Sequence, residues 1–424
     1  MKIFVGASQV VTCSGAARAR RGAEMRDAAI LGAGHAVVTD GERIVAVGAR
    51  DALERQYASA ERVECAGRVL TPGLVDSHTH AVFGKPRFEE QELRAEGVAY
   101  MEIARRGGGI HSSVRDLRAR SEDDLLALTR ERVARLASYG ATTIEIKSGY
   151  GLSTDAELTS LRVIARLQRE TTLRIVPTFL GAHEIPLEYR EREGGRREYV
   201  SLLTEEMIPC VVRDGLARFA DVFCEPGVFT LDETRTILRA ATARGLLAKL
   251  HADELEPLGG AELAAELGAT SADHLAAISE HGIAALAAST TVATLLPGTM
   301  LFLGRATQAP ARAMIAAGAA VALATDFNPG TSPTPSLPLM MTLGVSQLRM
   351  SVAEVLIATT VNGAAALALA DVTGQLAPGF AADLALWDCE DVREIPYWYG
   401  DRRCVATWTR GEPTRVADHV IAAA

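Results

Sequence analysis

From Val69 to about residue 370, short apolar runs alternate regularly with amphipathic stretches. The apolar runs predict eight strands, near residues 70–77, 142–148, 173–180, 219–225, 246–252, 270–274, 291–296 and 321–326. The stretches between them have helical spacing, and capping boxes are expected at Thr154–Glu157, Thr230–Glu233 and Ser351–Glu354. Strand–helix alternation predicts a parallel sheet, and eight units over about 290 residues predict an α/β fold, the (β/α)8 TIM barrel.

The segments that flank this alternation are β-like. Apolar runs at 36–39 and 43–47 are separated by Asp40-Gly41, a pair typical of a hairpin turn. After roughly residue 370, the segment Gly374–Asp388 contains turn residues followed by an apolar strand. We expect residues 1–66 and 369–424 to form the two halves of one small β-sandwich domain, with the barrel at 67–368.

Composition limits the partners and the compartment. The chain of 424 residues has a net charge of −9 and no long basic block, which argues against nucleic-acid binding. Its N-terminal apolar run is too short for a signal peptide, and none approaches the roughly 18 residues of a membrane-spanning helix. The six cysteines are widely spaced, as is typical of reduced thiols. We expect a cytoplasmic protein with no nucleic-acid or membrane partner.

Two histidines, His78 and His80, follow the first predicted barrel strand. Side chains two residues apart on a strand point to the same side, so both imidazoles can bind one cation. His251 closes the fifth predicted strand and Asp326 closes the eighth. The carboxyl ends of barrel strands meet at one mouth, where active sites lie. Three histidines and an aspartate leave a position for water, so the sequence predicts a catalytic metal site.

Further polar residues follow other strands. Glu254 lies three residues beyond His251, where it can act as the general acid and base on a bound water. His274 ends the sixth predicted strand and can polarise the substrate oxygen or hold the nucleophile. His183 ends the third and can hydrogen-bond a polar ring. A single histidine is more often structural, and His111 is interpreted so, but repeated placement at strand ends favours function.

Other residues suit a substrate with a carboxylate tail. Arg87, on the loop after the first barrel strand, can form a bidentate pair with a carboxylate. Tyr150 follows the second strand. Asn328, Gly330 and Thr331 follow the eighth and offer backbone and side-chain donors. From spacing alone, each of these residues could equally support the loop structure or contact a ligand. Glu145 and Lys147 can simply fill a layer of side chains inside the barrel.

At these residues the sequence resembles the amidohydrolase superfamily and, more narrowly, its imidazolonepropionase family, over nearly the whole chain. The resemblance is found in the segments Thr71–His80, Arg87–Tyr100, Gly107–His111, Glu145–Gly151, Phe179–His183, Asp221–Glu225, His251–Leu255, Ser271–Leu275, Leu296–Gly298, Ala324–Ser332 and Gly374–Leu384.

This resemblance implies a reaction, hydrolysis of 4-imidazolone-5-propanoate to N-formimino-L-glutamate in histidine degradation. It implies one Zn²⁺ or Fe³⁺ ion held by His78, His80, His251 and Asp326. It also implies substrate contacts at Arg87, Tyr150, His183 and Glu254, and product contacts at Asn328, Gly330 and Thr331. Binuclear superfamily members use a carboxylated lysine on strand four, and the strand here contains none.

Some alternatives and departures remain. A cytosine- or guanine-type deaminase could use the same metal, glutamate and strand-six histidine, but Arg87 and Tyr150 suit a carboxylate tail. A metal-free scaffold protein should lack ligands that this chain retains. Lys85 and Glu184 depart from the residues expected beside the substrate contacts. A homodimer is the expected assembly, as for many soluble enzymes.

Overall fold

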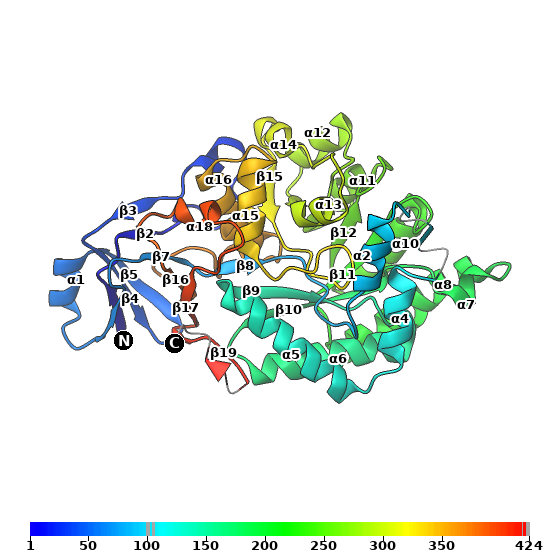
Figure 1. The fold of residues 1–424 in the computed structure, drawn as a ribbon, viewed down its shortest axis with the longest axis horizontal. Coiled ribbons are helices and arrows are strands. Elements are labelled where there is room, and N and C mark those ends of the chain that lie inside the picture. Colours follow the sequence, from blue (N-terminus) through cyan, green and yellow to red (C-terminus); the bar gives the residue numbers. More distant parts are fainter. Residues whose placement is uncertain (99–101, 104–106, 418, 421–424) are drawn as a thin grey trace.

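The computed structural model describes residues 1–98, 102–103, 107–417 and 419–420, so the end of the segment Arg87–Tyr100 lies outside the described residues. Its largest sheet has eight parallel strands in the order β15-β14-β13-β12-β11-β10-β9-β8 (Figure 1). The strands are β8 (Leu74–Asp76), β9 (Ala141–Lys147), β10 (Arg174–Ala182), β11 (Phe219–Cys224), β12 (Leu247–Ala252), β13 (Ser271–His274), β14 (Val292–Leu295) and β15 (Ala320–Leu323).

The two edge strands of this sheet approach each other beyond their ends. A parallel bridge joins Thr79 to Phe327, and the N–H of Asp326 donates to the carbonyl of His78 at 3.0 Å. These contacts bring the end of the first barrel strand beside the end of the eighth. The predicted (β/α)8 barrel is confirmed.

Helices follow the barrel strands and cover the outside of the sheet (Figure 1). Those of eight or more residues are α2 (Phe88–Ala95), α4 (Ile110–Arg118), α5 (Glu122–Ser138), α6 (Thr154–Glu170), α8 (Gly195–Leu202), α10 (Leu231–Thr242), α12 (Glu280–Ala288), α15 (Leu337–Ser346) and α16 (Val352–Thr359). The shorter helices of the described chain are η1 (Gly22–Arg26), α1 (Arg50–Gln56), α7 (Leu187–Arg190), η2 (Leu203–Met207), α9 (Ile208–Arg213), α11 (Gly260–Glu266), α13 (Pro297–Phe302), α14 (Ala311–Ala317), α17 (Val361–Ala365) and α18 (Glu394–Tyr397). Of these, α1 packs on N-terminal strands outside the barrel.

Two of the three expected capping boxes are present, at Thr230 and Ser351. The expected box at Thr154 is wrong, because α6 begins there with Ser153 as its N-cap. Its Glu157 instead accepts the backbone N–H groups of Gly149, Gly151 and Leu152 at 2.8–3.0 Å. The carboxylate thus stabilises the loop after β9 rather than the start of its own helix.

Strands from both ends of the chain build a small β domain. One sheet has the order β5 (Arg43–Ala49), β4 (His35–Asp40), β1 (Lys2–Val5), β6 (Glu61–Glu64). The other has the order β18 (Glu412–Pro413), β17 (Cys404–Thr409), β16 (Leu384–Trp387), β7 (Val69–Pro72), β2 (Gln9–Val11), β3 (Ile30–Gly32). A short hairpin of β19 (Arg415–Val416) and β20 (His419–Val420) follows.

The core of this domain joins the two sheets. The ring of Phe4 meets that of Trp408 edge-on, with centroids 5.0 Å apart, among buried residues of both sheets. The predicted small β domain from the two terminal segments is therefore confirmed, whereas its limits at residues 66 and 369 stay predictions.

The first expected barrel strand, at residues 70–77, is in fact two strands. β7 pairs with β2 and β16 in the small domain, while β8 pairs with β9 in the barrel. Gly73 separates them, and a Cβ built there would lie 2.1 Å from Oγ1 of Thr142. Only glycine permits this close approach. The chain therefore changes sheets immediately before it reaches His78.

Two further observations concern membrane-spanning helices and the state of the cysteines. Within the described part of the chain, no helix has both the length and the apolar composition needed to cross a membrane. All six cysteines are free thiols.

Candidate active site and metal centre

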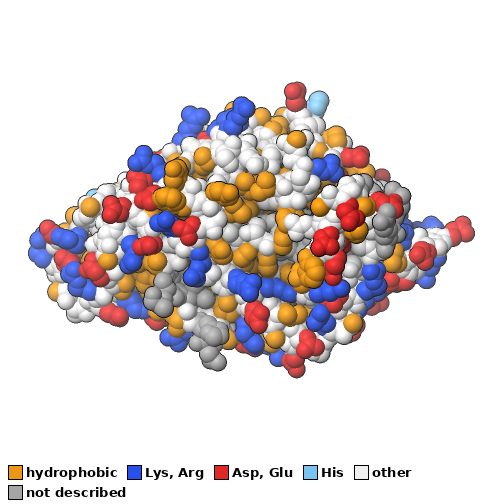
Figure 2. Space-filling model, in the orientation of Figure 1, with side chains coloured by type: hydrophobic (Ala, Val, Ile, Leu, Met, Phe, Trp, Pro, Cys, Tyr) orange, Lys and Arg blue, Asp and Glu red, His pale blue; other side chains and the backbone are white. Residues whose placement is uncertain are grey.

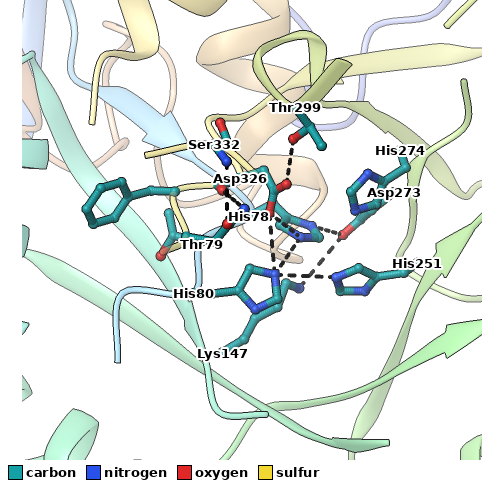
Figure 3. Close-up of polar contacts among 12 residues, drawn as sticks. His78, Thr79, His80, Lys147, His251, Asp273, His274, Thr299, Asp326 and Ser332 are labelled. Carbon is teal, nitrogen blue, oxygen red and sulfur yellow. Dashed lines mark hydrogen bonds and ion pairs between the residues drawn. The ribbon is translucent and has the colours of Figure 1, made fainter. Parts of the chain in front are cut away.

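Four side chains converge at the mouth of the barrel. Nε2 of His80 lies 3.2 Å from Nε2 of His78 and 3.4 Å from Nε2 of His251. Oδ1 of Asp326 lies 3.6 Å from Nε2 of His78 and 3.4 Å from Nε2 of His80. All four residues are buried, and Figure 3 shows them pointing toward one another, His78 and His80 from the end of β8, His251 from β12 and Asp326 from the end of β15. The structure thus brings together the four ligands that the sequence predicted.

This arrangement fits one metal ion. In tetrahedral zinc sites the ion lies about 2.0–2.1 Å from each ligand atom, which separates neighbouring ligand atoms by about 3.4 Å. The observed separations of 3.2–3.6 Å match that value. His274 lies beside the same potential metal position, since it forms a second potential ligand group with His78 and Asp326.

The electrostatics also suit a cation. Burial lowers the pKa of His78 and of His80 well below the ordinary value, so both rings are neutral and offer lone pairs. Burial raises the pKa of Asp326 to about 6, although Oγ1 of Thr299 donates to its Oδ2 at 2.6 Å. A cation would compensate for the burial of this carboxylate.

Two residues of the site have unusual backbone conformations. Asp326 has φ +51° and His274 has φ +80°, a region that few non-glycine residues adopt. Such strain persists where surrounding structure enforces it, and it concentrates at functional sites. The turn directs both side chains toward the cavity as each strand ends.

Glu254 lies beside this group with its side chain 11% exposed, and its Oε2 is 3.6 Å from Nδ1 of His274. Burial, followed by the charges of Asp326 and Glu225, raises the pKa of Glu254 well above its ordinary value. A carboxyl group with a raised pKa can both accept and return a proton near neutral pH. Glu225 accepts the backbone N–H groups of residues 254–256 at 2.8–3.1 Å and so holds this loop.

Arg87 also lines the cavity and is 5% exposed. Its Nη1 donates to Oγ of Ser113 at 2.9 Å, and its Nε lies 3.3 Å from Oε2 of Glu90. Its guanidinium packs against Gly330, where an added Cβ would stand 2.0 Å from Nη2. Gly330 therefore provides space for Arg87, and the N–H of Gly330 donates to Asn328.

Tyr150 and His183 form an aromatic part of the cavity wall beside His80. The ring of His183 stacks on His80, with centroids 5.1 Å apart, and the ring of Tyr150 lies 5.2 Å from that of His183. Nδ1 of His183 contacts the carbonyl of Gly149 at 2.9 Å. Burial lowers the pKa of His183 to about 3, so this ring is neutral and can hydrogen-bond a polar ligand.

The loop after β15 is organised by Asn328. Its Oδ1 accepts the N–H of Gly330 at 2.9 Å and that of Thr331 at 2.7 Å, while its Nδ2 donates to the carbonyl of Asp326. Asn328 and Thr331 line the cavity, whereas Gly330 lies behind Arg87. These contacts make Asn328 a support for the loop as well as a wall of the cavity.

The site residues predicted from the sequence, except His78 and Gly330, line one cavity of about 490 Å³. Its wall also includes residues that the sequence did not single out for function, namely Arg94, His111, Arg190, Glu225 and Arg305. His111, interpreted as structural, is 7% exposed there, and Glu184 pairs with Arg190 at 2.6 Å. Lys85 is exposed and lies 4.0 Å from Glu89, away from this wall.

A family comparison agrees with this geometry. Residues 86–415 match the Amidohydrolase family. The chain is 46% identical to the imidazolonepropionase of Bacillus velezensis, over 90% of this chain and 89% of that protein. It is 47% identical to the imidazolonepropionase of Solibacter usitatus, over 95% of this chain and 96% of that protein.

Solved structures share the fold at low sequence identity. A zinc-bound adenosine deaminase from Xanthomonas campestris superposes with a TM-score of 0.72 at 19% identity, covering 99% of this chain and 94% of that one. An atrazine chlorohydrolase variant from Arthrobacter aurescens gives a TM-score of 0.71 at 17% identity, covering 97% and 94%. From its sequence match and its barrel, the chain belongs to the amidohydrolase family and, within it, to the imidazolonepropionases.

Proposed function

We propose that this enzyme hydrolyses the cyclic amide of 4-imidazolone-5-propanoate to N-formimino-L-glutamate, a step of histidine degradation. The main support is the cavity itself, whose wall includes three of the four metal-type ligands, His80, His251 and Asp326, together with Arg87. A ring bound at His183 and Tyr150 would place its amide near Glu254 and its propanoate near Arg87. Arginine is well suited to that carboxylate.

We also propose that the site holds a single Zn²⁺ or Fe³⁺ ion through His78, His80, His251 and Asp326. Imidazole and carboxylate ligands suit either ion. A carboxylated-lysine bridge would need a free lysine, and β11 contains none. The buried Lys147 lies 2.8 Å from both Glu145 and Asp221, so its amine is already used in ion pairs.

In the mechanism we propose, His78, His80, His251 and Asp326 would hold an ion that would lower the pKa of a water toward 7, so that a nucleophile would be available at neutral pH. Glu254 accepts the proton as the water oxygen bonds to the ring carbonyl carbon. His274 stabilises the oxygen of the resulting tetrahedral adduct in this proposal. Glu254 then returns the proton to the ring nitrogen as the C–N bond breaks, leaving a formimino group and a carboxylic acid, which loses its proton to water and becomes a carboxylate.

The substrate distinguishes this proposal from its nearest rival, a deaminase of cytosine or guanine. Purified enzyme should consume 4-imidazolone-5-propanoate and form N-formimino-L-glutamate without releasing ammonia, as followed by ultraviolet absorbance and mass spectrometry. Ammonia release from cytosine or guanine, with no turnover of the imidazolone, would favour the deaminase.

We further propose a cytoplasmic homodimer. The free thiols suit a reducing compartment. Tyr397, Trp398 and Tyr399 are 72%, 44% and 75% exposed, and apolar side chains gather over α15 and α18 in Figure 2. Exposed patches of this kind often mark interfaces. Sedimentation should give twice the chain mass of 45.0 kDa, and a monomer would refute the proposed dimer. Cell fractionation should place the enzyme in the cytoplasm, and a secreted protein would refute the proposed compartment.

A further inference from the structure

Below the four ligands, five charged side chains fill the barrel interior. All have fully buried side chains and come from four different strands: Glu145 and Lys147 on β9, Asp221 on β11, Lys249 on β12 and Asp273 on β13. We call these five residues the charged layer. Burying five charged groups costs folding free energy unless each is paired, so we ask which groups each of them contacts.

Two carboxylates of the charged layer contact the metal-type histidines. Oδ2 of Asp273 lies 2.6 Å from Nδ1 of His78, and Oδ2 of Asp221 lies 3.0 Å from Nδ1 of His251. In both rings the other nitrogen, Nε2, faces His80 and the ligand cluster. A carboxylate that accepts a hydrogen from Nδ1 leaves the lone pair on Nε2, which is the atom that must bind a metal.

Two lysines hold these carboxylates in place. Nζ of Lys147 lies 2.8 Å from Asp221 and 3.8 Å from Asp273, so one ammonium links both. Nζ of Lys249 lies 3.6 Å from Asp273 and donates to the carbonyl of Ser77 at 2.8 Å. Figure 3 shows Asp273 between the ring of His78 and the amine of Lys147.

The third imidazole differs from these two. Nδ1 of His80 is buried with no hydrogen-bond partner and no carboxylate within ion-pair distance among the residues that the structure describes, whereas Nδ1 of His251, which also has no aligned hydrogen bond, lies 3.0 Å from Oδ2 of Asp221. The charged layer therefore orients His78 and His251 but not His80. Filling the barrel interior does not require that two carboxylates of the layer contact the rings of His78 and His251.

We infer that Asp221 and Asp273 are positioning residues of the metal centre, which fix the ring orientation and the tautomer of His251 and His78. The inference rests on the proposed metal site and goes beyond it, since it assigns a role to residues that touch neither metal nor substrate. Lys147 and Lys249 stabilise the two carboxylates in that role.

The test is the Zn²⁺ affinity of the metal-free protein, measured by competition with a chromophoric chelator. Asp221→Asn and Asp273→Asn should each weaken Zn²⁺ binding about 10- to 100-fold, the usual effect of removing such a partner. The double variant should bind more weakly than either, because the two carboxylates serve different rings.

A matched control is Asp383→Asn. Asp383 is 1% exposed and accepts Oγ1 of Thr373 at 2.7 Å and the N–H of Arg410 at 2.8 Å, remote in the fold from the ligands. This variant should lose thermal stability but keep the wild-type Zn²⁺ affinity. Thermal unfolding of each metal-free variant shows which of them fold. If only one of Asp221→Asn and Asp273→Asn folds, its Zn²⁺ affinity is sufficient for the test.

Folded Asp221→Asn or Asp273→Asn protein that binds Zn²⁺ within twofold of the wild type would overturn the inference. A wild type with no Zn²⁺ affinity would overturn the metal site and this inference together. The outcome is separate from the proposed reaction, because a wild type that binds Zn²⁺ normally but leaves the imidazolone unchanged would contradict only the reaction.

Discussion

Glu254→Gln should retain the metal of the wild type and lose kcat by about 1,000-fold, a typical contribution of a positioned general acid and base. Glutamine has nearly the same shape and can still accept a hydrogen bond, but it cannot take a proton from water or return one to nitrogen. KM should change little, because the lost interaction belongs to the transition state.

The position of Glu254 supports this large effect. Its carboxyl lies 3.6 Å from Nδ1 of His274, and its backbone is fixed by Glu225 at the end of β11. Glu256→Gln is the matched control, since Glu256 is exposed two residues further along the same loop. Steady-state kinetics with metal analysis of both variants is the measurement. Near-normal turnover by Glu254→Gln would show that another group moves the proton.

The second large effect is expected for Arg87→Met, which should lower kcat/KM for the imidazolone by about 100-fold, mostly through KM. Removing one partner of a buried charge pair costs about 2–5 kcal/mol, and each 1.4 kcal/mol is a factor of ten. The guanidinium is buried and touches Ser113 and Glu90, so a bound carboxylate would be shielded from water there.

A substrate without the tail isolates this interaction. Unsubstituted 4-imidazolone should be a poor substrate of the wild type, and Arg87→Met should scarcely change its turnover. Because the substitution also leaves Glu90 without that cation, Arg87→Met/Glu90→Gln measures how much of the loss arises from the buried glutamate. Equal losses with both substrates would mean that Arg87 acts through loop structure instead of the propanoate.

Much of the fold was predictable because hydrophobic periodicity reports local structure. The eight barrel strands and the hairpin at Asp40-Gly41 follow from apolar spacing and turn residues. The division at Gly73 was not predictable, because pairing with β16 joins residues about 300 positions apart. The missing box at Thr154 has a similar cause, since its glutamate finds three backbone donors in a neighbouring loop.

The candidate site divides in the same way. The ends of barrel strands share one mouth, so His78, His251 and Asp326 could be grouped from sequence. Asp221 and Asp273 gave no such signal, because their role depends on the register of four strands and on two buried lysines. The place of His111 in the cavity wall was not predictable, because it lies in the first turn of a helix that only the folded chain places beside the cavity.

We propose that one ion, held by the two histidines after β8 with His251 and Asp326, supplies the nucleophilic water that opens the imidazolone ring. Elemental analysis of the same purified sample used for turnover of 4-imidazolone-5-propanoate tests it most directly. We predict one zinc or iron per chain, loss of N-formimino-L-glutamate formation on chelation, and recovery when the ion is returned. Full turnover by protein with no stoichiometric metal, or two ions per chain, would contradict this account.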